Sequence, residues 1–158
     1  MTDNRADLQV GNLIFEVSRL MRRRFEEEAK GLGLTMQQAR VISFLHEASS
    51  GLPQKTIAKA IDMDPMTLSG ILDRLQKRKL VQRIVDPSDS RAKQVLLTED
   101  GRALYNEARA IGEGIGQKLA DRVLCRLPDS QREALITGLG VIRDELGDMS
   151  FAQKEKEK

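Results

Sequence analysis

Residues 54–77 read QKTIAKAIDMDPMTLSGILDRLQK, and this stretch carries two helical patterns separated by a tight break at Asp62 and Met63. The apolar residues of the first pattern predict one inner face, made of Ile57, Ala58 and Ile61. Asp64 followed by Pro65 is typical of an N-cap and a first helical position. The second helix repeats apolar residues at spacings of three and four, namely Leu68, Ile71, Leu72 and Leu75. A short helix, a turn and a second helix form a helix-turn-helix motif.

The residues that follow predict a β-hairpin. Two apolar-rich runs, 80–85 and 93–97, flank a polar tip that reads DPSDSR. Upstream, Thr35 and Gln38 fit a capping box that opens another helix. Three helices followed by a hairpin make a winged helix, so residues 35–97 are predicted to form a winged helix-turn-helix lobe. The fold class is mainly α with a small β-hairpin, an α+β arrangement.

A long amphipathic helix is predicted before the lobe. Residues 8–30 carry an apolar stripe at helical spacing. Within them, residues 22–28 read RRRFEEE, which places each arginine four residues before a glutamate. Such charge runs are typical of a solvated helix face.

Further helices are predicted after the lobe. Thr98 caps one that is expected to reach about Cys125. Three glycines in its middle predict either a kink or close packing against another element; they are Gly112, Gly114 and Gly116. A second capping box, residues 130–133, opens a last helix that is expected to end near Leu146.

Composition places the chain among ordinary globular proteins. Its 158 residues suffice for one domain with a sizeable core, and its net charge is only +2. A single cysteine excludes an intrachain disulfide and favours a reducing compartment. The polar N-terminus has no apolar signal core, and no apolar run approaches the ~20 residues that span a bilayer. We therefore expect a cytoplasmic protein without membrane contact.

Positive charge concentrates on the second helix and the hairpin. Residues 71–93 hold seven basic and three acidic residues, an excess of four on a chain whose whole net charge is +2. Such a patch indicates nucleic-acid binding, and a helix fits the major groove of double-stranded DNA. Its first turns would reach base edges, while Arg74 and Lys77 further along would meet phosphates. At the hairpin tip, Arg91 would enter the adjacent minor groove, with Asp89 orienting its guanidinium.

The predicted DNA-contacting residues lie on the two helices of the motif and on the hairpin. They are Lys55, Pro65, Met66, Thr67, Ser69, Gly70, Arg74, Lys77, Asp89, Arg91 and Lys93. Three have a plainer alternative: Met66 as a core residue, Gly70 as a packing accommodation and Arg91 as a solvated loop arginine. Asp73 would repel phosphate on this face unless it is paired, and its candidate partners are Arg74 and Arg91.

Residues 86–101, DPSDSRAKQVLLTEDG, resemble the wing of the MarR family of winged helix-turn-helix regulators, with its D-x-R sequence, alternating strand and L-T-x-x-G ending. The similarity is close over about residues 32–104, and beyond them it rests on the placement of the end helices. Two positions depart from the family pattern. Lys79 stands where glycine is frequent, and a positive φ there would cost about 1 kcal/mol. Gly70 stands where a basic residue is common.

The resemblance implies a homodimeric transcriptional regulator, most often a repressor, whose two lobes read a pseudo-palindromic operator. Helices near both termini would intertwine. Residues 1–34 are thus expected to form an N-terminal dimerisation helix, residues 98–150 the C-terminal dimerisation helices, and residues 151–158 a solvated tail. Many family members are released from DNA by a small phenolic or other amphipathic ligand, so a small-molecule effector is a candidate partner. The first helix lacks the cysteine of the family's peroxide-sensing branch.

Other functions remain open as alternatives. They are a winged helix that contacts proteins without DNA, a regulator that senses no ligand, and an enzyme with an unrecognised site. No Ser/His/Asp set, phosphate-binding loop or paired-acid motif occurs, so we expect neither an enzyme nor a cofactor. The only histidine, His46, has no partner at ligand spacing, so no metal site is expected. Cys125 is expected to be a small buried residue, with redox sensing beside Arg126 as the alternative.

Overall fold

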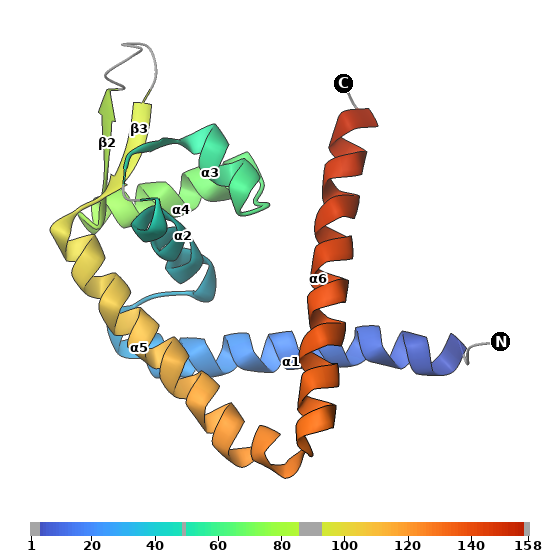
Figure 1. Cartoon of the computed structure of the whole chain (residues 1–158). Helices are drawn as coiled ribbons and strands as arrows, with labels where there is room; N and C mark the ends of the chain where they lie inside the picture. Colours follow the sequence, from blue (N-terminus) through green and yellow to red (C-terminus); the bar gives the residue numbers. More distant parts are fainter. Residues whose placement is uncertain (1–3, 49, 86–92, 157–158) are drawn as a thin grey trace. The chain divides into compact units, whose positions relative to one another are not determined.

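The computed structural model describes residues 4–48, 50–85 and 93–156 (Figure 1). It divides into two compact units, residues up to Ile115 and residues from Gly116 onward. The elements in chain order are α1 (Asn4–Glu28), the 3-10 helix η1 (Ala29–Leu32), α2 (Met36–Glu47), β1 (Leu52–Pro53), α3 (Gln54–Ala60), α4 (Pro65–Lys77), β2 (Val81–Val85), β3 (Lys93–Leu97), α5 (Glu99–Arg122), the 3-10 helix η2 (Leu124–Arg126) and α6 (Asp129–Lys156). This order confirms a mainly α fold with a winged helix-turn-helix.

Both predicted caps at the start of the lobe are confirmed. At α2, the Thr35 hydroxyl accepts the Gln38 backbone N–H at 3.2 Å, and the Gln38 side chain accepts the Thr35 N–H at 3.0 Å. At α4, one carboxylate oxygen of Asp64 accepts two backbone N–H groups at 2.9 Å, from Met66 and Thr67. Each cap satisfies donors that the first turn of a helix leaves unpaired. These bonds fix where α2 and α4 begin.

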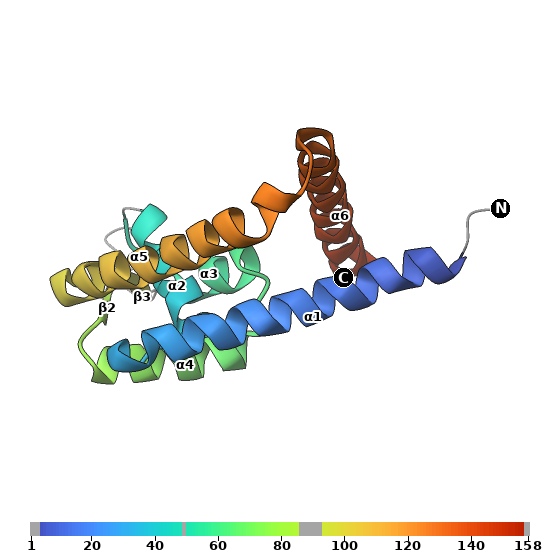
Figure 2. The same ribbon diagram turned by 90° about the horizontal axis from the view of Figure 1, so that it is seen from below.

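The core of the first unit lies where α2, α3 and α4 meet the sheet, and Figures 1 and 2 show these helices clustered at the base of the β2–β3 hairpin. The predicted inner faces of both helices in the motif are buried, as expected. From α1 and η1, Phe25 and Ala29 join this core. The largest fully buried side chains are Ile42, Ile57, Leu68, Leu72, Leu75, Val41 and Val95. Burial of these apolar side chains is the dominant favourable contribution to folding of the lobe.

The sheet has three strands in the order β1-β3-β2. The predicted hairpin is confirmed within one residue, with Val81 opposite Leu97 at one end and Val85 opposite Lys93 at the other. Strand β1 was not predicted: Leu52 pairs antiparallel with Val95 beside the hairpin. A two-residue strand that contains proline has too little alternation to be recognised in a sequence.

Gly101 occupies the last position of the L-T-x-x-G stretch, in the first turn of α5. The Thr98 hydroxyl accepts the Gly101 N–H at 3.0 Å, which confirms Thr98 as the cap, and it donates to the Lys79 carbonyl at 2.7 Å. The Thr98 N–H also donates to the Leu80 carbonyl at 3.1 Å. A Cβ atom at residue 101 would lie closer than 3.0 Å to that same carbonyl oxygen. The close approach of two backbones therefore requires glycine at this position.

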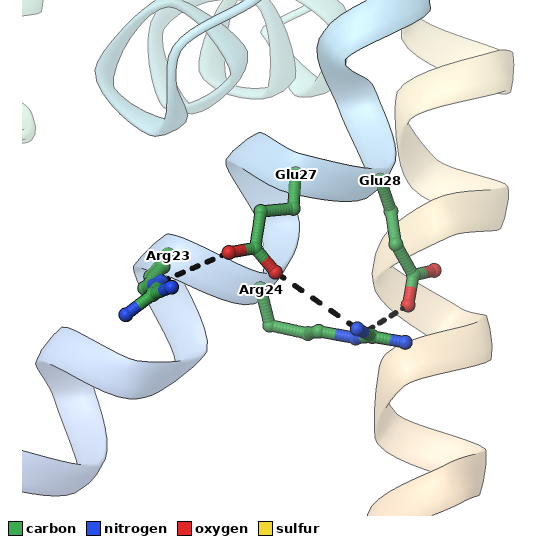
Figure 3. Close-up of polar contacts among 4 residues, drawn as sticks. All are labelled: Arg23, Arg24, Glu27 and Glu28. Carbon is green, nitrogen blue, oxygen red and sulfur yellow. Dashed lines mark hydrogen bonds and ion pairs between the residues drawn. The ribbon is translucent and has the colours of Figure 1, made fainter.

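The charge run in α1 is a solvated helix face, as predicted. Arg23 Nε lies 2.9 Å from Glu27 Oε1, and Arg24 Nε lies 2.8 Å from Glu28 Oε1 (Figure 3). Arg24 also reaches the second oxygen of Glu27 at 3.9 Å. Exposed pairs of this kind contribute only about 0.3–0.5 kcal/mol each.

The expectations for α5 and α6 need correction. Helix α5 runs through its three central glycines, and a Cβ at any of them would meet nothing within 4 Å in the described chain, so the glycines do not serve close packing within this part of one copy. Helix α5 ends at Arg122, before Cys125. Helix α6 begins at Asp129, which places Ser130 inside the first turn, where it is not the predicted cap. It continues past Leu146 to Lys156, because a single glycine at residue 147 does not end a helix when helix-forming residues follow.

Candidate nucleic-acid interface

The start of α4 presents its predicted contact residues to solvent. Pro65, Met66 and Thr67 are exposed, and Ser69 and Gly70 are half-buried. Met66 is 80% exposed, so the alternative that it belongs to the core is wrong. A Cβ at Gly70 would meet only the Arg74 guanidinium, at 3.9 Å, so packing does not require glycine there.

Basic side chains border this turn. Arg74 and Lys77 are exposed further along α4. Lys55 is exposed in the first turn of α3, and the preceding residue, Gln54, donates to the Pro65 carbonyl at 3.4 Å. The hydrogen bond links the first turns of the two helices, so exposed cations lie in the first turn of α3 and further along α4.

Asp73 is paired with a residue that the sequence did not indicate. Its Oδ1 lies 2.8 Å from Nη2 of Arg83 on β2, which corrects the expectation that Arg74 or Arg91 would neutralise it. Arg83 Nη1 donates to Gln76 Oε1 at 2.6 Å. Alternation along β2 carries the signal, because Arg83 shares a face with buried Val81 and therefore points inward.

A second basic residue of the patch is also engaged within the lobe. Arg78 donates through Nη1 to the Gly33 carbonyl and through Nη2 to the Leu32 carbonyl, both at 2.8 Å. The next residue, Lys79, has φ 60°, a left-handed conformation at the position where the resemblance suggested glycine. Thus Arg78 and Arg83 serve the fold, although both were counted in the basic patch.

The tip of the hairpin lies outside the described residues, and with it Asp89 and Arg91. The strands leading to it end at Val85 and Lys93, which are opposite each other and exposed. Lys93 is therefore the part of the predicted wing contact that the structure describes.

A cavity of about 530 Å³ lies between α2 and α5 in the first unit. Met36, Phe44 and Ile61 supply apolar lining, and Arg40 and Arg109 are its basic residues. Arg109 Nε donates to Glu113 at 2.7 Å, and this hydrogen bond, together with the charge of that carboxylate, raises the pKa of Arg109. The cavity thus combines apolar surface with charged groups, as a site for an amphipathic molecule would.

The only histidine and the only cysteine of the chain lie in different surroundings. His46 stacks on Tyr105 with ring centroids 3.9 Å apart. Among the described residues, no cluster of three or more His, Cys, Asp or Glu side chains could hold a metal ion. Cys125 is exposed, which corrects the expectation of burial, and its Sγ lies 2.8 Å from the Asp121 carbonyl oxygen. In the part of the chain described, no helix is long and apolar enough to span a bilayer.

Comparison with known proteins identifies the family. A sequence model of the MarR family matches residues 32–92. The chain is 28% identical over 127 residues to the uncharacterised HTH-type transcriptional regulator YhbI of Bacillus subtilis, covering 75% of this chain and 82% of that protein. The chain belongs to the MarR family. It is accordingly a winged-helix transcriptional regulator.

Two solved structures are similar to this chain over most of its length. The Staphylococcus aureus MepR–DNA complex aligns with a TM-score of 0.75 at 26% identity, over 85% of this chain and 96% of that one. CouR from Rhodococcus jostii RHA1, bound to p-coumaroyl-CoA, aligns with a TM-score of 0.68 at 28% identity, over 84% of this chain and 90% of that one. This MarR-family chain is therefore similar to one protein solved with DNA and to one solved with p-coumaroyl-CoA.

Proposed function

We propose that this MarR-family protein is a homodimer that binds a pseudo-palindromic DNA operator and acts as a repressor. Each copy inserts the start of α4 into the major groove and lays its hairpin over the adjacent minor groove. The observation that carries the proposal is the solvent-exposed first turn of α4, capped by Asp64 and bordered by unburied cations. A major groove about 12 Å wide admits a helix presented in this way.

The contacts divide by chemistry. Pro65, Met66 and the two small residues Ser69 and Gly70 suit base edges, because apolar groups touch thymine methyls and a hydroxyl bonds to either kind of base. Thr67 can bond to the backbone or a base edge. Four cations suit phosphates and fix the register without reading sequence; they are Lys55, Arg74, Lys77 and Lys93.

Arg91 is proposed to enter the narrow minor groove, with Asp89 holding its guanidinium in a bidentate contact. A narrow groove concentrates negative potential, so the binding energy of an arginine there depends on the width of the groove as well as on charge. Support for this assignment comes from the D-x-R sequence and from the strands β2 and β3, which lead directly into that tip.

Dimerisation is supported by apolar surface that each unit leaves uncovered. In α1 the exposed apolar side chains are Leu8, Val10, Leu13, Phe15, Val17, Leu20 and Met21. In α6 they include Leu135, Ile136, Leu139, Val141 and Leu146. So many uncovered apolar side chains on two long helices favour an interaction surface, and a second copy of the chain supplies complementary helices. We therefore assign dimerisation to residues 1–34 and 98–150, and DNA binding to residues 35–97.

The cavity between α2 and α5 is proposed to hold an amphipathic effector that releases the operator. Its volume and its mixed lining suit a small aromatic or acyl compound with an anionic group near Arg40, because Arg109 is already paired with Glu113. CouR, which resembles this chain, was solved with p-coumaroyl-CoA. A regulator that senses no ligand is the alternative, and titration with aromatic acids would separate the two.

Selection of bound sequences from random duplex DNA tests the DNA-binding proposal. We expect an enriched inverted repeat, and at ~150 mM salt we expect Arg91→Ala to weaken binding to it sharply while leaving the dimer intact. Arg126→Ala, a change of an exposed arginine in η2, is the matched control and should bind normally. Enrichment of no sequence, or normal binding by the Arg91 variant, would favour a winged helix that contacts protein instead.

Sedimentation tests the dimer. Phe15 is 78% exposed in α1, and Phe15→Gln should shift the protein toward monomer. Glu16→Gln changes the next, also exposed, residue and should leave the dimer unchanged. A Phe15 variant that sediments as the wild type does would exclude this stretch of α1 from the interface.

A further inference from the structure

Arg83 forms a polar bridge between α4 and the hairpin. Its guanidinium spans two residues on consecutive turns of α4, with Asp73 at 2.8 Å and Gln76 at 2.6 Å. The Arg83 side chain is only 22% exposed, whereas that of Asp73 is 55% exposed. A planar guanidinium with two partners fixes both the distance and the orientation of β2 relative to α4, whereas the ammonium group of a lysine would fix only the distance.

The position of this bridge along β2 suits it to hold the wing, which is the β2–β3 hairpin, against α4. At the base of the strand, Val81 is 2% exposed and anchors β2 in the core. Toward the tip, Ile84 is 38% exposed and Val85 57% exposed, so apolar packing no longer holds the strand there. Arg83 lies between these two regions. Beyond Val81, the polar bridge is the direct attachment of β2 to α4. The paired strand β3 stays in the core through Val95, which lies opposite Arg83, and holds β2 by backbone pairing.

The same bridge compensates the negative charge of Asp73 on the exposed face of α4. An unpaired Asp73 beside the proposed phosphate contacts of Arg74 and Lys77 would repel DNA. Pairing with Arg83 neutralises it from the protein side. Arg83 is consequently occupied by α4, and its cation is not free to meet a phosphate.

We propose that Arg83 is a positioning residue that sets the offset between α4 and the wing, and thereby the spacing between the major-groove and minor-groove contacts that the protein accepts. The inference rests on the proposed DNA-binding function. Arg83 itself stays on Asp73 and Gln76 in the complex and contacts no phosphate. Loss of the bridge leaves both contact surfaces present but lets the wing move relative to the helix, so ordering the wing opposes binding.

The salt dependence of binding separates this role from direct contact. Full-length wild type, Arg83→Met and Lys77→Met are titrated with the selected operator over a range of salt concentrations. Methionine keeps much of the apolar stem and removes the charge. We expect Arg83→Met to bind about fivefold more weakly at ~150 mM salt, the scale of one partly exposed bridge, with an unchanged log–log salt slope. Lys77→Met, the matched control, should lower the magnitude of that slope by about 0.9, the value for one phosphate.

Hydrogen exchange of the free protein supplies a readout that does not depend on DNA. Arg83→Met should speed amide exchange in β2 and β3, and Lys77→Met should not. A slope reduced by about 0.9 in the Arg83 variant, with unchanged exchange, would overturn the proposal and make Arg83 a phosphate contact. Wild type that prefers no duplex would instead overturn the proposed function, whatever the exchange shows.

A second variant distinguishes positioning from simple neutralisation. Asp73→Asn removes the acid but keeps an oxygen acceptor. In the Arg83→Met background it should recover only part of the lost affinity, because β2 still lacks its direct polar attachment to α4. Full recovery to wild-type affinity would overturn the positioning role and leave charge neutralisation as the whole effect of Arg83.

Discussion

Substitution of Gly101 by alanine tests how closely the first turn of α5 packs against the backbone of the lobe. A Cβ at this position would lie within 3.0 Å of the Leu80 carbonyl oxygen, and it would also meet Leu97 Cδ2 at 3.0 Å. The first of these neighbours is backbone, so it cannot rotate away as a flexible side chain would. The clash must be relieved by moving α5 or the connection between α4 and β2.

The size of the effect follows from two opposing contributions. Overpacking against a fixed neighbour costs about 3 kcal/mol, and alanine in place of a helical glycine returns about 1 kcal/mol. The net loss is about 2 kcal/mol, which for a chain of this size lowers the Tm by about 4–8 °C. Differential scanning calorimetry at fixed protein concentration measures the shift.

The matched control is the same substitution later in the same helix. A Cβ at Gly112 has nothing of the described chain within 4 Å, so Gly112→Ala should raise the Tm by about 2–4 °C. A Gly101→Ala protein that melts at or above the wild-type temperature would refute the argument that backbone proximity requires glycine there. A fall in both variants would mean that α5 is covered along its length by something else.

Three further substitutions test single contacts. Asp64→Ala removes the acceptor for two N–H groups and should cost about 1 kcal/mol in urea denaturation, whereas Asp64→Asn should cost little; equal losses would exclude capping as the cause. Lys79→Gly relieves a left-handed backbone at φ 60° and should stabilise the protein by about 0.5–1 kcal/mol, and a loss of stability would contradict the strain argument. Arg78→Met removes two bonds to the η1 turn and should cost about 1 kcal/mol, with faster amide exchange near Gly33; unchanged exchange there would make the bonds energetically silent.

Features set by local chemistry were predictable from the sequence. Caps at Thr35 and Asp64 need only side-chain oxygens near free N–H groups, and the buried stripe of α4 follows from helical periodicity. The hairpin followed from two apolar runs around a polar, proline-containing tip. Each of these signals lies in the helix or hairpin that it specifies, or directly beside it in the sequence.

Contacts between distant residues were not predictable. The Arg78 side chain meets carbonyls 45 and 46 residues earlier in the chain, and no spacing rule encodes such a bond. The sequence indicates Arg74 or Arg91 as the partner of Asp73, whereas in the structure strand β2 brings Arg83 to it. A count of positive charges therefore overstated the cations available for DNA, because two of them are held by the fold.

Strand β1 also bears on how the protein behaves at high concentration. It closes one side of the sheet with only two residues, and the second, Pro53, has no N–H to offer to another chain. Short, proline-containing borders of this kind prevent sheets from growing by recruiting strands of neighbouring molecules. On that side the sheet offers a neighbouring chain few backbone donors, so we expect little sheet-mediated self-association even when several copies crowd on nearby sites.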